Sequence, residues 1–509
     1  MKKVLLLAFA LLITSFSFSQ KVNFKKLDAY IEKAVKDFDQ PGLAVGIVKD
    51  GELVWSNGYG KLDLAKDDLV DPNSIFFIAS MSKAFTACAV GLLVDDGKLN
   101  WNDPVVKHMS WFQTPDPWVT EHMVVKDLLC HRSGWITFDG DLLWYGADYD
   151  QREILERHSK EPTTYEFRNG YGYSNLMFIA AAQLIEEVSG KTWNEFIAER
   201  ILAPLDMKRT TVTTADLTNF ENVALPHVRK GQEAGTPQKS MAYQSLVGAD
   251  GATGINSCIT DLAKWDAMWA NEGLVGDSAF ISERTWVTIT TSINSFPVRP
   301  VDATEGKHYS GAALGWFTED MYGVKVIDHS GGMPGFILNH VVVPEKDLAV
   351  IALGNGESYS VFAATSKILD LYLGEDDTDP ATKYLGYMQR GAERNATRRA
   401  ERIESRIEGT SPSYENSAYV GSYLDKIYGS ASVSEEARSL VMSLDPAAEL
   451  FTGKLVHWHH DTWQWQHNDP FLEFGYVTFY FNADHKIEGF KIDQHSPDFH
   501  FYKLDLVRQ

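Results

Sequence analysis

The spacing of apolar side chains changes along the chain, and each change predicts a different kind of element. Residues 24–38 carry apolar side chains at helical spacing, which predicts an N-terminal helix. Residues 41–60 form two apolar runs on either side of a Lys-Asp-Gly turn, a pattern typical of a β-hairpin. Residues 309–354 hold short strand-like runs, so we expect neighbouring strands of an antiparallel sheet there.

Helical patterns predominate between these segments. Residues 80–94 are mostly apolar and small, which predicts a buried helix that ends near Gly97. Residues 173–202 predict two helices separated by a Ser-Gly break, and residues 257–273 predict one more. We therefore expect a region of helices between the hairpin and the later strands.

The character of the chain changes again towards its C-terminus. Residues 384–409 are highly charged and compatible with a helix, and a break that contains Ser and Pro follows at 410–413. From residue 414 apolar and polar positions alternate as they do in strands, which predicts a small all-β barrel or sandwich. We therefore expect a first domain at 20–383, a helical linker at 384–413 and a β domain at 414–509.

The first nineteen residues have a different composition from the rest. Two lysines precede an apolar run from Val4 to Ile13, and small residues follow it. This order is typical of a secretory signal peptide at 1–19, cleaved near Ser19. No later run reaches the roughly 18 apolar residues that a membrane span needs. We therefore expect an exported, periplasmic or extracellular protein with no transmembrane segment after signal removal.

Charge and cysteine content narrow the possible partners and bonds. The net charge is −22, and because a nucleic-acid partner requires a basic surface, that class of partner is not expected. The three cysteines are Cys88, Cys130 and Cys258. Exported proteins that depend on disulfides usually carry more cysteines, in an even number, so we interpret all three as small buried residues. Whether Cys130 or Cys258 pairs in a disulfide stays open.

A Ser-x-x-Lys pair at Ser80 and Lys83 is the first candidate for chemistry. Residues three apart share one face of a helix, so the lysine lies one turn behind the serine. A buried lysine near a helix N-terminus has a lowered pKa, and its neutral amine could take the serine proton. The alternative is a serine that caps the helix and a solvated lysine. The pair alone does not decide between them, because it is short enough to arise by chance.

Two further segments carry side chains suited to the same chemistry. Tyr173 and Asn175 are two apart in an extended or loop segment, so they could face one cleft. A phenol can share proton traffic with a lysine, and an amide can orient both a substrate carbonyl and the lysine. The alternative is a tyrosine in a turn and an asparagine that caps the next helix. At 328–332 a strand ends in His329 and two glycines, which would let a substrate backbone come close.

These three elements, in this order, resemble the signature motifs of the serine β-lactamase and penicillin-binding-protein superfamily. They read SMSK at 80–83, YSN at 173–175 and HSG at 329–331. The pattern is most similar to the class C-like branch, which includes D-aminopeptidases, D-amino-acid-specific peptidases and esterases. The resemblance covers roughly residues 24–375, with further similar text at 41–60, 127–135 and 253–265.

The resemblance implies a fold and a mechanism. The fold would be α/β (α+β), an antiparallel sheet flanked by helices, with a mostly helical subdomain between the first and third motifs. The mechanism would be acyl transfer without a metal or organic cofactor. Ser80 would be the nucleophile, Lys83 the base that activates it, and Tyr173 the group that relays the proton to the leaving group. Asn175 would position the substrate.

The third motif would bind the substrate through His329, Gly331 and Gly332, and the N–H groups of Ser80 and Gly332 would form the oxyanion hole. It also departs from the family pattern. β-Lactamases and many cell-wall transpeptidases carry a lysine where this chain has His329, and a histidine is mostly neutral at pH 7. The histidine fits the peptidases, esterases and amidases of the branch better than it fits an enzyme for penicillin.

The main hypothesis is therefore an exported serine hydrolase that acts on a small (D-)peptide or on an ester. One alternative is a β-lactamase or D,D-carboxypeptidase. Another is a protein that binds penicillin or muropeptides without turnover, although a receptor has no need of a deacylation apparatus. No oligomeric state follows from the sequence.

The C-terminal segment resembles the lipocalin-like domain often appended to this branch, with similar text at 419–423 and 455–463. Its His-rich stretch at 457–461 raises the question of a metal site. In a strand, however, His457 and His459 share one face and His460 points away, so we predict no metal there. Trp144 and Tyr145 fall between the first two motifs, and we expect them either to line the substrate pocket or simply to pack.

Overall fold

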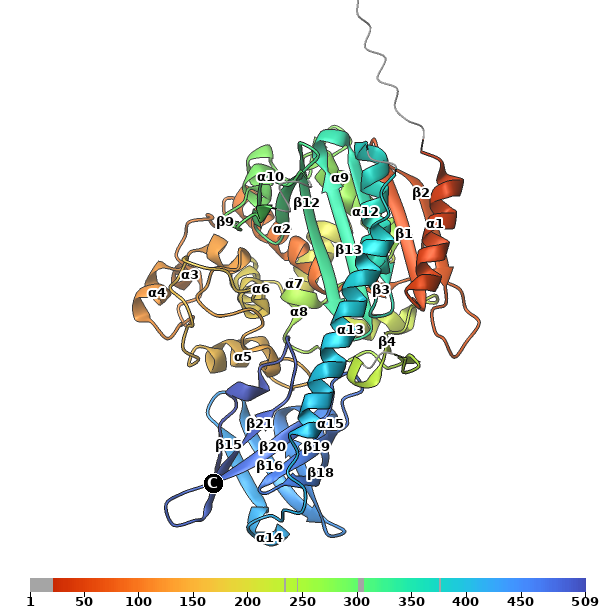
Figure 1. Ribbon diagram of the computed structural model, residues 1–509. Coiled ribbons are helices and arrows are strands. Elements are labelled where there is room, and N and C mark those ends of the chain that lie inside the picture. The colour runs from red at the N-terminus through yellow and green to blue at the C-terminus, as the bar shows by residue number, and fades with distance from the viewer. Residues whose placement is uncertain (1–21, 233–234, 245, 301–305, 375–376) are drawn as a thin grey trace, which may run out of the picture.

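The computed structural model describes residues 22–232, 235–244, 246–300, 306–374 and 377–509. The predicted signal peptide at 1–19 lies outside these residues. The described chain forms a large domain of sheet and helices and a smaller β-barrel, joined by one long helix (Figure 1). This architecture confirms the predicted α/β (α+β) class. Within the described ranges, no helix has both the length and the apolar character needed to cross a membrane.

An eight-stranded antiparallel sheet forms the centre of the large domain, in the order β2-β1-β14-β13-β12-β11-β10-β9. The predicted hairpin is β1 (Gly42–Lys49) and β2 (Glu52–Gly60). β1 also pairs with β14 (Leu348–Gly354), so the hairpin near the start of the domain forms one sheet with strands from the end of the domain's sequence. The other strands of the sheet are β9 (Asn294–Ser295), β10 (Ser310–Ala312), β11 (Phe317–Met321), β12 (Val324–Met333) and β13 (Phe336–Val343).

Helices cover both faces of this sheet (Figure 1). On one face Leu27 shares an apolar cluster with Val350. On the other, the rings of Phe85 and Trp265 stack with centroids 3.8 Å apart, in a cluster that includes Ile351. Because both faces are covered, β14 is buried along its whole length and its sequence is continuously apolar. The covering helices are α1 (Phe24–Asp37) and α12 (Ser360–Leu373) on one face and α2 (Ser82–Asp95) and α9 (Ile259–Ala270) on the other.

A mostly helical subdomain lies beside α2, between the first and third motifs in sequence (Figure 1). Its longest helix is α6 (Asn175–Ser189), which packs on α2 and so brings the second motif next to the first. The remaining described α-helices between the first and third motifs are α3 (Val105–His108), α4 (Pro117–His122), α5 (Gln151–His158), α7 (Trp193–Ile197), α8 (Asp250–Thr253) and α10 (Glu283–Thr290).

The helix predicted at 80–94 begins later than expected. Residues Ala79–Met81 form a 3-10 turn, and α2 starts at Ser82. Met81 occupies the position before α2, and no side chain caps the helix there. The hydroxyl of Ser80 therefore does not cap α2, so the helix-cap interpretation of this serine is wrong.

One long helix, α13 (Pro380–Glu404), leads from α12 to the barrel, and it begins and ends earlier than the helix expected at 384–409 (Figure 1). The barrel is closed, which confirms the predicted small β-barrel and leaves its strands without a free edge. Its strands are β15 (Gly421–Asp425), β16 (Gly429–Glu436), β17 (Ser439–Leu444), β18 (Thr452–His459), β19 (Thr462–His467), β20 (Gly475–Phe481), β21 (Ile487–Asp493) and β22 (Leu506–Arg508).

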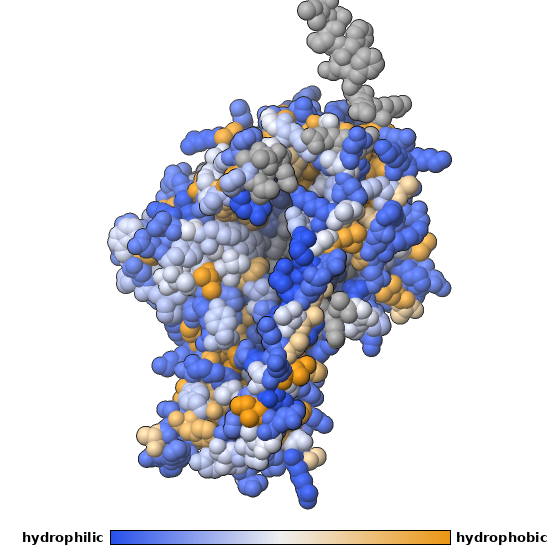
Figure 2. Space-filling view, viewed as in Figure 1, coloured by the Kyte–Doolittle hydropathy of each residue, from blue (hydrophilic) through white to orange (hydrophobic). Residues whose placement is uncertain are grey.

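The surface and the thiols agree with the composition. Hydrophilic residues dominate the face shown in Figure 2, with only scattered hydrophobic ones, as expected for a chain of net charge −22. Cys88, Cys130 and Cys258 are all buried and free, so the disulfide left open by the sequence does not form in this structure. Burial raises the pKa of each thiol. These cysteines therefore behave as small apolar residues.

Candidate active site

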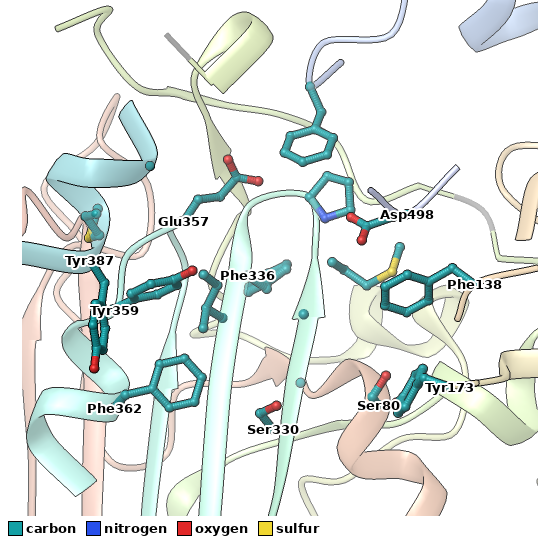
Figure 3. Close-up of a pocket in the computed structure, with 18 of the residues that line it drawn as sticks. Ser80, Phe138, Tyr173, Ser330, Phe336, Glu357, Tyr359, Phe362, Tyr387 and Asp498 are labelled. Atoms are coloured by element: carbon teal, nitrogen blue, oxygen red, sulfur yellow. The ribbon is translucent and has the colours of Figure 1, made fainter. Parts of the chain in front are cut away.

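Ser80 lies in a tight turn between a short strand and α2. The strand β3 (Phe76–Phe77) pairs with β6 (Asn256–Ser257), which fixes the entry to the turn. Ala79, directly before the serine, has φ +48°, a left-handed conformation that costs a residue with a side chain of order 1–3 kcal/mol. The flanking elements hold this strained turn in place, and it presents Ser80 to the cleft in front of α2 (Figure 3).

Lys83 is buried in the first turn of α2 and has three hydrogen-bond partners. Its Nζ lies 3.0 Å from Ser80 Oγ, 2.7 Å from Asn175 Oδ1 and 3.0 Å from the carbonyl oxygen of Ala252. The amide and carbonyl oxygens can only accept hydrogen bonds, whereas the serine hydroxyl can also donate one. A neutral amine would therefore spend its two N–H groups on Asn175 and Ala252 and keep its lone pair for Ser80. This is the geometry that a base for the serine requires.

Lys83 and Tyr173, the two side chains that could transfer protons with Ser80, have very different pKa values. Burial lowers the pKa of Lys83 to about 7, and the nearby Asp141 carboxylate acts in the opposite direction. Burial raises the pKa of Tyr173 well above its ordinary value, which a hydrogen bond with Ser80 offsets in part. Near neutral pH the lysine is therefore available as a base, and the phenol stays protonated and can act as an acid.

This difference predicts the pH dependence of the reaction. Below pH 7 the Lys83 ammonium has no lone pair, so kcat/KM should fall about tenfold per pH unit, and above pH 7 it should reach a plateau. Burial also lowers the pKa of His329, to about 3, so the titration of this histidine does not change the pH–rate profile near neutral pH. The measurement is kcat/KM on an uncharged ester from pH 5 to 9. A flat profile across pH 6 to 8 would contradict Lys83 as the base.

The second motif reaches the site from the loop before α6. The Lys83 Nζ lies 4.9 Å from the centre of the Tyr173 ring, and this ring also stacks on His131 with centroids 4.3 Å apart. Ser174 caps α6 by accepting a hydrogen bond from the N–H of Met177 at 3.3 Å. The alternative in which Asn175 caps this helix is therefore wrong, and its side-chain amide binds Lys83 instead.

Asn175 connects the lysine to a carboxylate that sequence reasoning missed. Its Nδ2 donates to Asp141 Oδ2 at 2.6 Å, and Trp144 Nε1 donates to Asp141 Oδ1 at 2.9 Å. Burial raises the pKa of Asp141 to about 8, and these two hydrogen bonds and Lys83 oppose that shift. No motif marks Asp141. The only signal was its place three residues before Trp144, which the sequence suggested for the pocket.

The third motif lies on the part of β12 that faces the Ser80 turn. β11 pairs with β12 only as far as Asp328, so the strand beyond it has no neighbour on that side in the sheet. A Cβ on Gly331 would lie 2.4 Å from the carbonyl oxygen of Ile78, so only glycine lets the strand approach the turn so closely. A Cβ on Gly332 would meet open space, which places this residue at the cleft itself.

His329 lies deeper than the sequence suggested. Only 1% of its surface is exposed, its Nδ1 lies 2.6 Å from the carbonyl oxygen of Ser330, and its Nε2 has no hydrogen-bond partner among the described residues. Its ring packs against that of Phe317 at 5.2 Å. With its lowered pKa the imidazole is neutral. It therefore supplies no fixed positive charge for a substrate carboxylate.

A cleft of about 1470 Å³ opens in front of these residues. Figure 3 shows Ser80 and Tyr173 together on one side of it and Tyr359, Phe362 and Tyr387 on the other. The barrel supplies part of the wall, through Phe471, Asp498 and Phe499. Trp144 also lines the cleft, whereas the Tyr145 hydroxyl turns away to donate to Asp469 of the barrel at 2.9 Å.

Comparisons with known proteins agree with this arrangement. Residues 27–374 match the family model described as Beta-lactamase, and residues 405–508 match the one described as Domain of unknown function (DUF3471). An unguisins hydrolase of Aspergillus campestris is 30% identical over 360 residues, which are 68% of this chain and 64% of that protein. A teichoic acid D-alanine hydrolase of Staphylococcus aureus is 30% identical over 192 residues, 38% of this chain and 45% of that protein. The chain thus spans less than two thirds of either relative.

A solved structure aligns with nearly the whole chain. The octameric penicillin-binding protein homologue from Pyrococcus abyssi aligns with a TM-score of 0.63 and 22% identity, over 96% of this chain and 100% of that one. At this identity the likeness establishes the fold and not the chemistry.

Proposed function

The chain belongs to the beta-lactamase family, and from this premise we propose that it is a serine hydrolase that cleaves an amide or ester bond through an acyl-enzyme on Ser80. The observation that carries the proposal is the set of partners around Lys83 Nζ. Two of them are pure acceptors, so the amine lone pair is directed at the Ser80 hydroxyl. Burial lowers the pKa of Lys83 to about 7, so part of the lysine is neutral at physiological pH, as a base requires.

In the acylation step Ser80 Oγ attacks the carbonyl carbon of the substrate while Lys83 Nζ takes the hydroxyl proton. The N–H groups of Ser80 and Gly332 stabilise the oxyanion that forms. As the tetrahedral intermediate collapses, the carbon bond to the leaving nitrogen or oxygen breaks. Tyr173 gives its proton to that leaving group and recovers one from the Lys83 ammonium.

Deacylation repeats these steps with water as the nucleophile. A water molecule attacks the acyl carbon and gives its proton to the Tyr173 and Lys83 pair. The bond to Ser80 Oγ breaks, and Lys83 returns a proton to the serine. The net reaction consumes one water and releases the free acid, so no external oxidant, reductant or cofactor is required.

The substrate we favour is a small peptide or ester, with D-residues at the scissile bond. His329 is neutral and buried, so it does not hold the substrate carboxylate as a lysine would. The Staphylococcus relative is named for D-alanine hydrolysis, which supports the D-configuration. The cleft of about 1470 Å³ exceeds the roughly 300–1,000 Å³ typical of drug-sized ligands, which supports a peptide longer than one residue.

The test is a substrate panel with the purified protein. We expect turnover of D-amino acid p-nitroanilides and of p-nitrophenyl esters, and rates at least about tenfold lower on the matched L-amino acid compounds, a difference of about 1.4 kcal/mol in transition-state binding. Turnover of nitrocefin at the ester rate would instead favour a β-lactamase. A stable adduct with penicillin and no turnover of any compound would favour a binding protein.

We also propose that the protein is exported, because the first nineteen residues have the order of a signal peptide. The small substrate would then be met outside the cytoplasm. N-terminal sequencing of the mature protein tests this, and an intact Met1 on the active protein would contradict it.

A further inference from the structure

We propose that Asp141 is a positioning residue for Lys83 and Asn175, and that the C-terminal barrel holds it in place. This inference rests on the proposed acyl-enzyme function and assigns a task to the barrel, whose contacts reach the active site through Trp144.

Asp141 determines which way the Asn175 amide faces. The carboxylate is only 2% exposed and accepts the amide N–H at 2.6 Å. The opposite end of the amide, Oδ1, is then the atom that accepts from Lys83 at 2.7 Å. If the amide turned over, its NH2 group would face the lysine, and two donors would oppose each other. Both oxygens of Asp141 accept hydrogen bonds in this structure, so its presence behind Asn175 selects the productive orientation.

Asp141 itself is held from its other side. Trp144 Nε1 donates to Asp141 Oδ1 at 2.9 Å, so each carboxylate oxygen accepts one hydrogen bond. Gly140, directly before it, has φ +81°, and a Cβ there would lie 2.6 Å from the His158 ring and 2.7 Å from Leu176. The chain therefore turns sharply at Gly140 and directs Asp141 inward, beneath α6.

The barrel holds the short segment that carries Asp141. Lys503 of the barrel donates to Asp139 at 2.7 Å, and the ring of Phe499 stacks on Tyr145 with centroids 4.0 Å apart. The same Phe499 ring meets Trp144 edge to face at 6.5 Å. Together with the hydrogen bond from Tyr145 to Asp469 at 2.9 Å, these contacts fix both ends of the segment 139–145.

A continuous path of contacts thus runs from the barrel to the nucleophile: Phe499, Trp144, Asp141, Asn175, Lys83 and Ser80. A barrel that only covered the cleft would affect large substrates and leave a small ester untouched. A barrel that positions Asp141 affects the rate on every substrate, including the smallest. The two roles therefore predict different kinetics.

Charge around the lysine supports the same assignment. The titratable groups near Lys83 are Asp141, Tyr173, His131 and His329. Burial raises the pKa of the tyrosine and lowers those of both histidines, so all three are neutral near pH 7. Asp141 is the group whose ionised form raises the pKa of Lys83, but burial raises its own pKa to about 8, so it is mostly protonated near pH 7. Removing its remaining charge should move the titration of the lysine only slightly to lower pH, and the main effect expected is the loss of positioning.

The experiment compares full-length variants on p-nitrophenyl acetate, a small uncharged ester, across pH 5 to 9. Asp141→Asn is nearly isosteric, but its amide can accept from only one of its two donors. We expect kcat to fall about tenfold or more and the acid limb to move only slightly to lower pH. Trp144→Phe, which deletes only the N–H donor, and Phe499→Ala should each lower kcat at least about threefold, a loss of roughly 0.6 kcal/mol of transition-state stabilisation. Tyr502→Ala, an exposed aromatic of the barrel, is the matched control and should keep the wild-type rate.

The outcomes separate this inference from the function on which it rests. If wild type forms no fluorophosphonate adduct, the proposed function fails. If wild type forms one and Asp141→Asn keeps both the wild-type kcat and its acid limb, the positioning role fails alone. If Asp141→Asn is impaired but Trp144→Phe and Phe499→Ala, both folded by thermal melt, match wild type, the contribution of the barrel is overturned.

Discussion

Replacing Ser80 with alanine is expected to lower kcat/KM by about 10⁴-fold or more, because the acyl-enzyme cannot form without its nucleophile. Intact mass after treatment with a fluorophosphonate gives the direct readout. Wild type should gain a single adduct, and Ser80→Ala none. The alanine is small and the side chain caps no helix, so the variant should keep the fold.

The matched control is Ser330→Ala, which removes the other serine hydroxyl that lines the cleft. The hydrogen bonds of the Lys83 amine go to Ser80, Asn175 and Ala252, so this lysine is not bound to Ser330. The Ser330 variant should keep the adduct on Ser80. An adduct of equal yield on Ser80→Ala would show that another residue is the nucleophile, and the mechanism would have to be abandoned.

Local patterns were sufficient to predict much of the large domain. The hairpin at 41–60 follows from two apolar runs around a turn, and residues 24–38 form α1 because their apolar side chains share one face. The three motifs also carried enough information to bring Ser80, Lys83 and Tyr173 into one cleft. Their catalytic roles stay predictions, since geometry shows where side chains lie and not what they do.

The missed features depend on contacts between distant segments. Asp141 became part of the site only because α6 places Asn175 beside it, 34 positions later in the chain. Ser174 and Asn175 are both good helix caps, and local propensity could not tell which would take that position. The contact between Lys503 and Asp139 joins residues 364 positions apart. No periodicity reports such a pairing, because it arises only once two domains have packed together.

The start of α2 illustrates a third limit. Apolar composition predicts a helix from residue 80, yet the left-handed Ala79 and a 3-10 turn delay it to Ser82. A left-handed backbone conformation is unfavourable for alanine, so it persists only where the packing of the neighbouring elements holds the chain in place. Departures from local preference tend to gather at functional sites, and this one falls at the candidate nucleophile.

Replacing Lys83 with methionine is expected to lower kcat/KM about 10³-fold on the same uncharged ester, the loss typical of a general base. Methionine fills a similar space, but its thioether sulfur is far too weak a base to take the serine proton. The rate that remains should also lose its acid limb near pH 7, because the group that titrates there is gone. A fluorophosphonate should still label Ser80, but far more slowly than in wild type.

Lys325→Met is the control that separates this effect from the loss of any buried lysine. Lys325 is also partly buried, burial also lowers its pKa, and its Nζ donates to Thr290 at 2.9 Å away from the cleft. This variant should keep the rate and the limb near pH 7. If Lys83→Met kept that limb, the titrating base would have to be another group. Tyr173 and His329 could not supply that limb, because burial raises the pKa of the first and lowers that of the second to about 3. Asp141, with a pKa of about 8, would be the group of the site left to titrate there, and the assignment of the base to Lys83 would fail.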